Sequence, residues 1–340
     1  MTQPIQPLTR QACWRQELAC AYTSPEQLAA ALALPADALM SARSAAQQFS
    51  LRVPRGYAAR MRRGDLNDPL LKQVWPVADE MERQQGFFGD PVGDLAAMPV
   101  PGLLHKYHGR VLLVVGGACA VHCRYCFRRH FPYGQANALA RQRDRVLDYI
   151  GQDESISEVI LSGGDPLSVS DSHLSALVGQ LAQIPHVKRL RIHTRLPVML
   201  PERVDNALLA WISAFPRQVI VVFHTNHANE IDQSVARGFA RLSTIGVTLL
   251  NQSVLLKGVN DDADALCELS EALYASGVLP YYLHMLDKVQ GAAHFQVSAD
   301  YALQLMDIVR QRLPGYLVPN LVYEQAGALS KLPLTGGVRK

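Results

Sequence analysis

The chain has 340 residues, of which 49% are hydrophobic and 19% charged, enough apolar material for a sizeable core in one large domain or two modest ones. Lys and Arg number 33 and Asp and Glu 30, so the formal net charge is only +3. This balance argues against a nucleic-acid-binding or membrane-surface protein, and solvated helix faces explain local basic clusters such as Arg60, Arg62 and Arg63.

No stretch approaches the roughly eighteen consecutive apolar residues of a membrane-spanning helix. The N-terminal segment MTQPIQPLTRQACWRQEL also lacks the apolar core of a signal peptide, so we expect a cytoplasmic protein with reduced thiols. Three of the six cysteines, Cys119, Cys123 and Cys126, fall within eight residues, which favours a ligand cluster over a disulfide framework. The scattered cysteines are interpreted as structural or incidental: Cys13, Cys20 and Cys267.

Residues 1–100 are predicted to form a helical accessory region. In SPEQLAAALAL, Ser24 is a candidate N-cap with Gln27 three positions on, and DADALMSARSAAQQF continues at helical spacing. The segment 53–56 is predicted to break this pattern, because it contains Pro and Gly. Near residues 90–102 the sequence GDPVGDLAAMPVPG predicts a linker or domain boundary.

Beyond residue 105 a core domain is predicted up to residue 330, followed by a short C-terminal segment, 331–340. Helical patterns separate six short apolar runs: 111–115, 158–162, 189–194, 218–224, 247–256 and 279–286. Such strand–helix units predict an α/β fold with a parallel sheet, and periodicity leaves a doubly wound sheet and an incomplete barrel equally open. In both folds, functional groups gather at the carboxyl ends of the strands.

The cysteine triplet lies in GGACAVHCRYCFRRH with the spacing C-x3-C-x2-C, directly after the first predicted strand. Thiolates suit iron–sulfur clusters or zinc. Three of them can hold three irons of a [4Fe–4S] cubane and leave the fourth iron open, whereas a structural zinc ion needs a fourth ligand. Because His122 and His130 lie nearby, zinc remains an alternative at this point.

With Tyr125 just before its last cysteine, this segment resembles the radical S-adenosylmethionine (SAM) superfamily. The sequence SGGDP resembles that superfamily's second signature, in which the backbone of Gly163 and Gly164 and the side chain of Asp165 would meet the amino group of SAM. The resemblance implies an incomplete parallel (β/α)6 barrel. It also implies that one electron from the cluster cleaves SAM to a 5′-deoxyadenosyl radical, which abstracts hydrogen from an unactivated carbon.

Five further phrases narrow the resemblance to the lysine 2,3-aminomutase family, over roughly residues 53 to 335. They are VPGLLHKYHGRVLLVV, CRYCFRRHF, HTNHANEID, LLNQSVLLKGVND and YYLHMLDKVQGAAHF. Members of this family use pyridoxal 5′-phosphate (PLP) beside SAM and the [4Fe–4S] cluster, and they move an amino group between adjacent carbons.

The family resemblance implies a role for individual residues. Lys331 falls at the position of the lysine that binds PLP, and Schiff-base formation needs such a primary amine. Lys106 and Arg110 match positions that hold the PLP phosphate, while His224 and Gln252 match polar positions on the SAM side.

Three residues match substrate-binding positions of the family. Arg128 matches the arginine that binds the substrate carboxylate, and Asp287 and Glu324 match carboxylates that bind the distant ammonium of lysine. Two carboxylates favour a basic substrate over an acidic one, since an acidic side chain would meet like charge. The alternatives are an aminomutase of arginine or glutamate, and a non-catalytic iron–sulfur or zinc-binding module.

Within the family, GGACAVHCRYCFRRHFPYG and LNQSVLLKGVNDDAD are most similar to the bacterial branch associated with elongation factor P. The resemblance implies that the enzyme makes β-lysine, which a separate ligase attaches to that factor. The chain ends nine residues past Lys331, as expected for this shorter branch. A low-potential reductant such as flavodoxin or ferredoxin is expected to supply the electron, and no nucleic-acid or membrane partner is expected.

Overall fold

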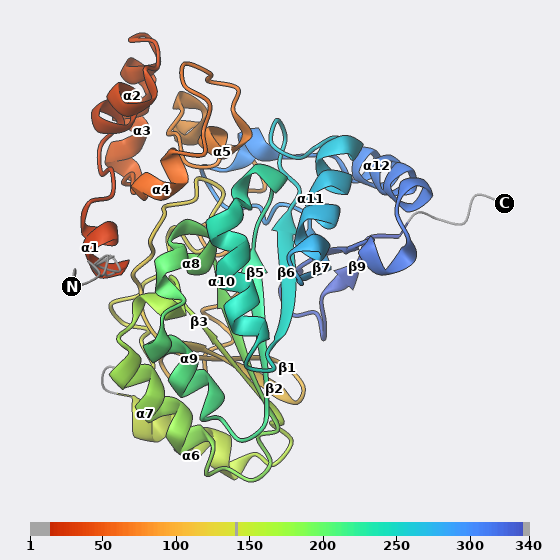
Figure 1. Ribbon diagram of the computed structural model, residues 1–340. Helices are drawn as coiled ribbons and strands as arrows, with labels where there is room; N and C mark the ends of the chain where they lie inside the picture. Colours follow the sequence, from red (N-terminus) through yellow and green to blue (C-terminus); the bar gives the residue numbers. More distant parts are fainter. Residues whose placement is uncertain (1–13, 140–141, 336–340) are drawn as a thin grey trace, which may run out of the picture.

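The computed structural model describes residues 14–139 and 142–335, and its N-terminal part is a group of short helices (Figure 1). These are α1 (Trp14–Ala19), α2 (Pro25–Leu32), α3 (Ala38–Gln48), α4 (Arg55–Ala58), α5 (Pro69–Lys72) and a 3-10 turn over Ala78–Met81. Cys13 and most of the N-terminal segment considered for a signal peptide lie outside the described residues, as do residues 336–340 of the predicted C-terminal segment.

The start of α2 matches the sequence pattern, because the Ser24 hydroxyl accepts a hydrogen bond from the backbone N–H of Gln27. The break predicted at residues 53–56 is wrong in its second half. Helix α4 begins at Arg55, directly after Pro54, whose extended backbone opens a new helical turn.

A single nine-stranded sheet forms the centre of the molecule, with its strands in chain order. They are β1 (Leu103–Tyr107), β2 (Arg110–Val114), β3 (Glu158–Ser162), β4 (Arg189–Thr194), β5 (Gln218–His224), β6 (Thr248–Val254), β7 (Leu279–His284), β8 (Asn320–Tyr323) and β9 (Leu332–Pro333). Strands β2 to β8 run parallel, while β1 and β9 pair antiparallel at the two edges. The six predicted runs are confirmed as β2 to β7.

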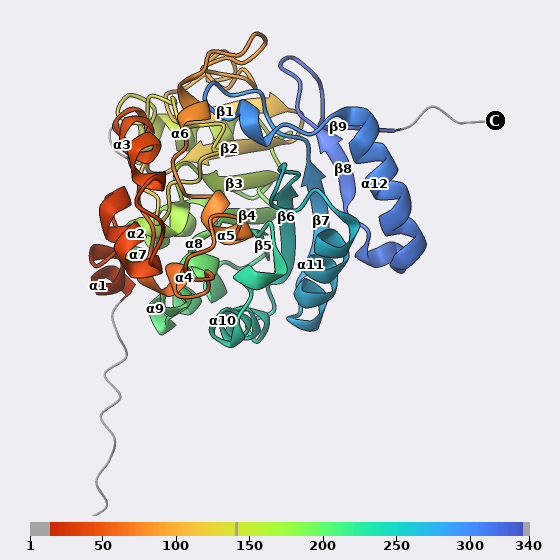
Figure 2. The ribbon, with the colours of Figure 1, turned by 90° about the horizontal axis from the view of Figure 1, so that it is seen from above.

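Helices connect the parallel strands and cover one side of the sheet. They are α6 (Arg143–Gln152), α7 (Asp171–Leu181), α8 (Leu196–Met199), α9 (Asn206–Ser213), α10 (Gln233–Ser243), α11 (Ala263–Ala275) and α12 (Ala299–Arg312). Figure 2 shows the sheet curving like an open trough, with α10, α11 and α12 outside the curve. A doubly wound sheet would carry helices on both faces, so the α/β fold is the incomplete parallel barrel.

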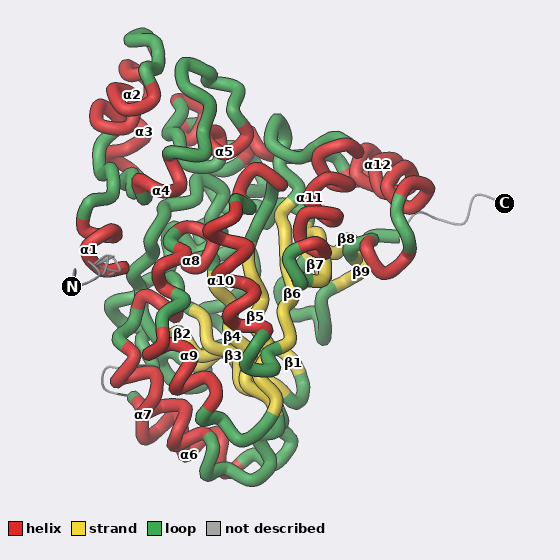
Figure 3. The backbone as a smooth tube through the Cα atoms, viewed as in Figure 1, coloured by secondary structure: helices red, strands yellow, loops and turns green. Residues whose placement is uncertain are grey.

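Three strands were not predicted from the sequence, because their apolar runs are short or interrupted by polar residues. Strand β1 has two apolar residues followed by polar ones, β8 has four residues and β9 has two. Strand β8 extends the parallel part of the sheet to seven strands, one more than predicted. Figure 3 shows how much loop surrounds these strands compared with the long central ones.

One continuous apolar core joins the N-terminal helices to the barrel. Leu28, Tyr57 and Trp75 from the N-terminal part belong to the same buried cluster as Leu113 of β2 and Ile192 of β4. The division of the chain into 1–100, 105–330 and 331–340 stays a prediction. Among the residues that the structure describes, no helix has the length and apolar character needed to cross a membrane.

The turn before β1 imposes a strict demand for glycine at one position. Gly102 has φ +87°, and a Cβ there would lie 2.3 Å from the backbone nitrogen of Ala138. We expect Gly102→Ala to lower the free energy of unfolding by about 1–2 kcal/mol through the left-handed backbone and by a further 1–3 kcal/mol, roughly, through overpacking.

Gly246→Ala is the matched control for this substitution, measured by urea denaturation. Gly246 has φ +77°, but nothing lies within 4 Å of its added Cβ, so only the backbone cost is expected. Equal losses of stability in the two variants would contradict the close approach at Gly102.

Candidate active site

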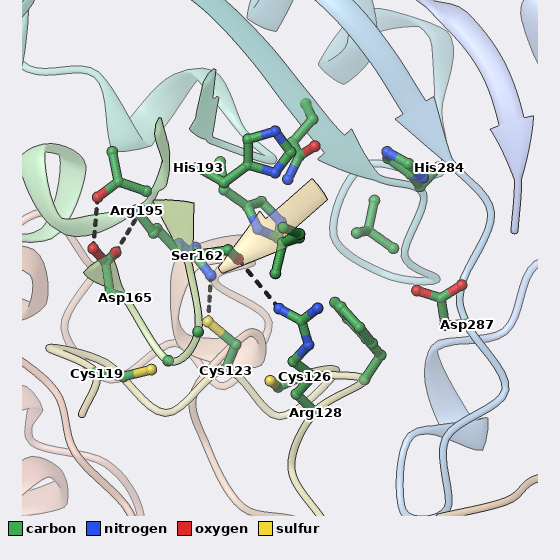
Figure 4. Close-up of a pocket in the computed structure, with 18 of the residues that line it drawn as sticks. Cys119, Cys123, Cys126, Arg128, Ser162, Asp165, His193, Arg195, His284 and Asp287 are labelled. Carbon is green, nitrogen blue, oxygen red and sulfur yellow. Dashed lines mark hydrogen bonds between the residues drawn. The ribbon is translucent and has the colours of Figure 1, made fainter. Parts of the chain in front are cut away.

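A cavity of about 500 Å³ opens at the carboxyl ends of the barrel strands, and the residues predicted to bind the cluster, SAM, PLP or substrate all line it (Figure 4). These residues are Cys119, Cys123, Cys126, Lys106, Arg110, Arg128, Gly163, Gly164, Asp165, His224, Gln252, Asp287, Glu324 and Lys331. The volume is within the usual range of small-molecule sites. The structure thus brings the predicted residues together, while the role of each stays a prediction.

The three cysteines lie in the loop after β2, and a buried arginine within this loop binds it to the N-terminal part of the protein. Arg124, which is fully buried, forms hydrogen bonds with both carboxylate oxygens of Glu80, at 2.6 and 2.8 Å. Burial raises the pKa of Cys126 to about 11, and the negative charge of Cys123 adds to the shift. Cysteines in this environment therefore ionise to thiolates only with a cationic partner, such as the irons of a cluster.

The donor set fits a cluster better than a single metal ion. Among residues 14–139 and 142–335, no three His, Cys, Asp or Glu side chains converge closely enough to hold one ion. His122 is engaged with the carbonyl of Ser50 at 2.8 Å, and His130 with that of Gln290 at 3.2 Å. In a cubane each thiolate binds a different iron, so the three sulfurs need not converge on one point. These contacts speak against the zinc alternative.

The glycines after β3 are required by packing against the cysteine loop. Gly163 has φ +132°, and a Cβ on it would lie 2.3 Å from the carbonyl oxygen of Gly116. A Cβ on Gly164 would lie 2.6 Å from the carbonyl oxygens of Gly117 and Ala118. The close approach therefore positions the cysteine loop beside the end of β3, independently of any contact with SAM.

The Asp165 carboxylate is engaged within the protein, while its contact with the amino group of SAM stays a prediction. One carboxylate oxygen accepts hydrogen bonds from Thr194 Oγ1 and the Leu167 N–H, and the other from the N–H groups of Arg195 and Leu196. A carboxylate offers about four acceptor positions, and all are used within the protein. Asp165 ties the end of β3 to the end of β4.

Five charged side chains of alternating sign cross one wall of the cavity. Lys331 Nζ donates to Glu324 Oε2 at 2.8 Å, and Lys106 Nζ donates to Glu324 Oε1 at 2.9 Å. Lys106 also pairs with Asp94 Oδ1 at 2.6 Å, and Arg128 Nε donates to Asp94 Oδ2 at 2.7 Å. Since β1 carries Lys106 and Glu324 follows β8, this series of ion pairs spans the two edge regions of the open sheet.

The charges in this series set the protonation of its acidic members. Burial alone would raise the pKa of Glu324, but Lys331 and Lys106 outweigh burial and lower the pKa to about 2. Burial raises the pKa of Asp287 to about 7, and the negative charge of Glu324 adds to this shift. The two carboxyl groups of the proposed ammonium site therefore differ widely in pKa, and Asp287 titrates near neutral pH.

The two residues predicted to bind the PLP phosphate differ in availability. Lys106 donates its three hydrogens to Asp94, Glu324 and the carbonyl of Val92, so it binds phosphate only by exchanging one of these acceptors. The Arg110 guanidinium stacks at 4.8 Å over the ring of Tyr107 and has no hydrogen bond to another described residue. Arg110 is therefore the better candidate.

The residues predicted on the SAM side lie on neighbouring strands. His224 and Gln252 face each other in register across β5 and β6. Burial lowers the pKa of His224 to about 3, with the positive charge of Arg195 adding to the effect, so its imidazole is neutral. Its Nε2 lies 3.4 Å from the hydroxyl of Tyr125.

Several residues that shape the cavity were missed in the sequence. Asp94 lies in the segment interpreted as a linker, where no local signal marks it. Strand β4 did carry a signal, because Arg191 and His193 alternate with buried Leu190 and Ile192, and both polar side chains line the cavity. Figure 4 shows His193 and, one step beyond the strand, Arg195 pointing into the site.

Comparisons with known proteins agree with this geometry. The profile of a family described as "4Fe-4S single cluster domain" matches residues 108–194. L-lysine 2,3-aminomutase of Escherichia coli (strain K12) is 49% identical over 322 residues, which cover 94% of this chain and 94% of that protein. The chain belongs to the lysine 2,3-aminomutase family. It is an isomerase of the aminomutase type that carries a [4Fe–4S] cluster.

Further relatives carry the same name. L-lysine 2,3-aminomutase of Haemophilus influenzae is 46% identical over 329 residues, covering 96% of this chain and 97% of that protein. That of Clostridium subterminale is 37% identical over 271 residues, covering 79% of this chain and 65% of the longer relative. The cofactors of the family are the cluster, SAM and PLP, and the cavity offers thiols for the first and the Lys331 amine for the last.

The series of ion pairs predicts a large stability cost for one substitution. Asp94→Asn removes the carboxylate shared by buried Arg128 and by Lys106. Arg128 then has no ion-pair partner among the described residues, and Lys106 keeps only Glu324, so we expect a loss of about 3–5 kcal/mol in the free energy of unfolding. The control Asp307→Asn breaks the exposed pair with Arg310 and should cost less than about 1 kcal/mol. If the two variants lost similar amounts of stability in urea denaturation, burial of the Asp94 ion pairs would not contribute to stability as expected.

Proposed function

We propose that this protein isomerises L-lysine to β-lysine, using the [4Fe–4S] cluster, SAM and PLP. The observation that supports this most directly is the separation of charge in the cavity. Arg128 provides a guanidinium from the cysteine loop, while Glu324 and Asp287 provide carboxyl groups from the end of the barrel beyond β7 and β8. A substrate with a carboxylate at one end and an ammonium at the other matches this arrangement.

Arg128 is held in an orientation suited to a carboxylate. Its Nε donates to Asp94 and its Nη1 to Ser162 Oγ at 3.2 Å, which uses two of its five N–H donors. The remaining donors lie on the two terminal nitrogens, from which a guanidinium binds a carboxylate in bidentate geometry. Asp94 thus positions the guanidinium without consuming its capacity for the substrate.

Glu324 already binds a primary ammonium in the structure, that of Lys331. Under the proposal, Lys331 would hold PLP through its amine, and Glu324 Oε2 would then be available for the distant ammonium of lysine. The lysine chain would then extend between Arg128 and Glu324, with its reactive carbons held in the enclosed cavity.

The remaining assignments follow the same logic. Cys119, Cys123 and Cys126 would hold the cluster, and Arg110 would bind the PLP phosphate. When bound, the cluster and SAM supply a carbon-centred radical, and PLP stabilises the migrating amino group. The protein's own task is to orient lysine and keep solvent away from it, for which a cavity among buried strand ends is suited.

Glutamate is disfavoured as the substrate, because its side-chain carboxylate would face Glu324 and Asp287. Arginine keeps the favourable charge and is the second candidate. A non-catalytic iron–sulfur module would not need a Lys331–Glu324 pair inside the same cavity as the cysteines.

The central test is anaerobic turnover of the reconstituted protein with SAM, PLP, dithionite and each amino acid in turn. We expect lysine to give β-lysine, separated by chromatography, while arginine and glutamate give at least about tenfold lower rates, which corresponds to about 1.4 kcal/mol of discrimination. Turnover of glutamate alone would refute the charge argument, and turnover of none would leave the non-catalytic module.

A variant of Lys331 tests the PLP assignment. Lys331→Ala should lose the borohydride-trappable bond to PLP and its activity, while it keeps the iron content of the wild type, because Lys331 lies on the opposite side of the ion-pair series from the cysteine loop. Lys188→Ala, which changes an exposed lysine, is the control. Retention of the trapped bond in Lys331→Ala would place PLP on another amine.

The pKa of Asp287 predicts a pH dependence of lysine capture. Its folded pKa of about 7 means that the carboxyl is protonated, and unable to pair with an ammonium, below that pH. The ratio of kcat/KM for lysine between wild type and Asp287→Asn should therefore rise about tenfold per pH unit from pH 5 towards 7 and become constant above it. A ratio independent of pH would exclude Asp287 from ammonium binding.

We further propose that the β-lysine serves a ligase that modifies elongation factor P, that a low-potential donor such as flavodoxin or ferredoxin delivers the electron, and that the protein works in the cytoplasm. The 94% mutual coverage with the Escherichia coli protein supports a role shared with that relative. Loss of β-lysine from elongation factor P after deletion of the gene, measured by mass spectrometry, would test the first point.

A further inference from the structure

Arg195 makes the most unusual contact in the cavity. It follows the last residue of β4, is 6% exposed, and donates from Nη1 to the sulfur of Cys123 at 2.8 Å. Figure 4 shows this bond between Arg195 and the sulfur of Cys123. A buried guanidinium therefore touches one of the three cluster ligands directly.

The position of Arg195 is fixed from several directions. Its backbone N–H donates to Asp165 Oδ2 at 2.7 Å, which ties it to the end of β3. Its Nη2 donates to Gln73 Oε1 at 2.7 Å and to Glu230 Oε2 at 2.8 Å, and its Nη1 also contacts the hydroxyl of Tyr125. Such a network holds the guanidinium against the sulfur with little freedom to move.

Glu230 is the counter-charge of Arg195 and is itself fully buried. Its Oε1 accepts hydrogen bonds from the backbone N–H of Asn226 at 3.0 Å and from Gln73 Nε2 at 3.1 Å. Burial would raise the pKa of Glu230, but Arg195 and these donors lower it, so both members of the pair are charged. The positive member faces the sulfur, while the negative member lies behind it.

We propose that the Arg195–Glu230 pair sets the reduction potential of the [4Fe–4S] cluster through the sulfur of Cys123. Reduction adds one electron from a low-potential one-electron donor to the 2+ cluster and gives the 1+ cluster, with no bond broken and no proton moved. A hydrogen bond and a positive charge at a ligand sulfur stabilise the added electron, while a buried carboxylate opposes it.

This inference depends on the cluster alone and not on the identity of the amino acid that is isomerised. It also differs from a purely structural role in the sign of its effects. Removing the charge of Arg195 should make the cluster harder to reduce, whereas removing the charge of Glu230 should make it easier to reduce. Loosening of the loop would not give opposite signs.

The test is a redox titration of anaerobically reconstituted protein without lysine, with dithionite as reductant and the electron paramagnetic resonance signal of the 1+ cluster as readout. At a fixed potential, we expect the ratio of reduced to oxidised cluster to fall at least about tenfold in Arg195→Gln and to rise by a similar factor in Glu230→Gln. A tenfold change corresponds to about 59 mV for one electron.

Arg191→Gln is the matched control. Arg191 lies in β4, the strand that Arg195 follows, and lines the same cavity, but its hydrogen bond goes to Glu158 and not to a cysteine. We expect its potential to equal that of the wild type. Iron content is measured for every variant, so that loss of the cluster is separated from a shift in its potential.

Arg195→Lys covers the case in which Arg195→Gln fails to bind the cluster. It keeps the positive charge, so at a fixed potential its ratio of reduced to oxidised cluster should lie within twofold of the wild-type ratio. Glu230→Gln then provides the decisive measurement. The proposal is overturned if variants with full iron content show unchanged ratios, or if Arg195→Gln and Glu230→Gln shift in the same direction. If the reduction potential shifts in opposite directions as expected but lysine is not turned over, only the proposed substrate is rejected.

Discussion

The structure depends most on the series of ion pairs that joins the two edge regions of the sheet. An open barrel leaves its first and last strands without mutual backbone hydrogen bonds, and here Lys106 on β1 reaches Glu324 after β8 instead. Asp94 and Lys331 extend the contact on either side. Each member is buried or half-buried and has a partner of opposite charge, so each side chain fixes the next one.

Under the proposed function, this arrangement would let one connected set of side chains bind both ends of a small zwitterionic molecule. Asp94 orients Arg128 at one end of the series, and Lys106 holds Glu324 near the other. Lys106 pairs with both Asp94 and Glu324, so it links the two groups proposed to bind the ends of the substrate.

The sequence predicted the long strands and the cysteine loop because their signals are local: apolar runs of five or more residues and cysteines within one short loop. It missed β1, β8 and β9, whose few residues carry little periodicity, and it missed Asp94, whose two partners lie 12 and 34 residues away. The Lys106–Glu324 pair joins residues 218 positions apart. The saturation of Asp165 also depends on four donors from two strand ends, which only the folded chain brings together.

The cluster side and the substrate side of the cavity use the same physical device. In each, a buried arginine lines the cavity and pairs with a buried carboxylate: Arg195 with Glu230 beside Cys123, and Arg128 with Asp94 beside Ser162. The carboxylate makes burial of the guanidinium tolerable, and the fixed pair presents its positive end to the cavity. A charge oriented before the reaction needs no rearrangement when an electron or a carboxylate arrives, so both the charge of each arginine and its fixed position contribute.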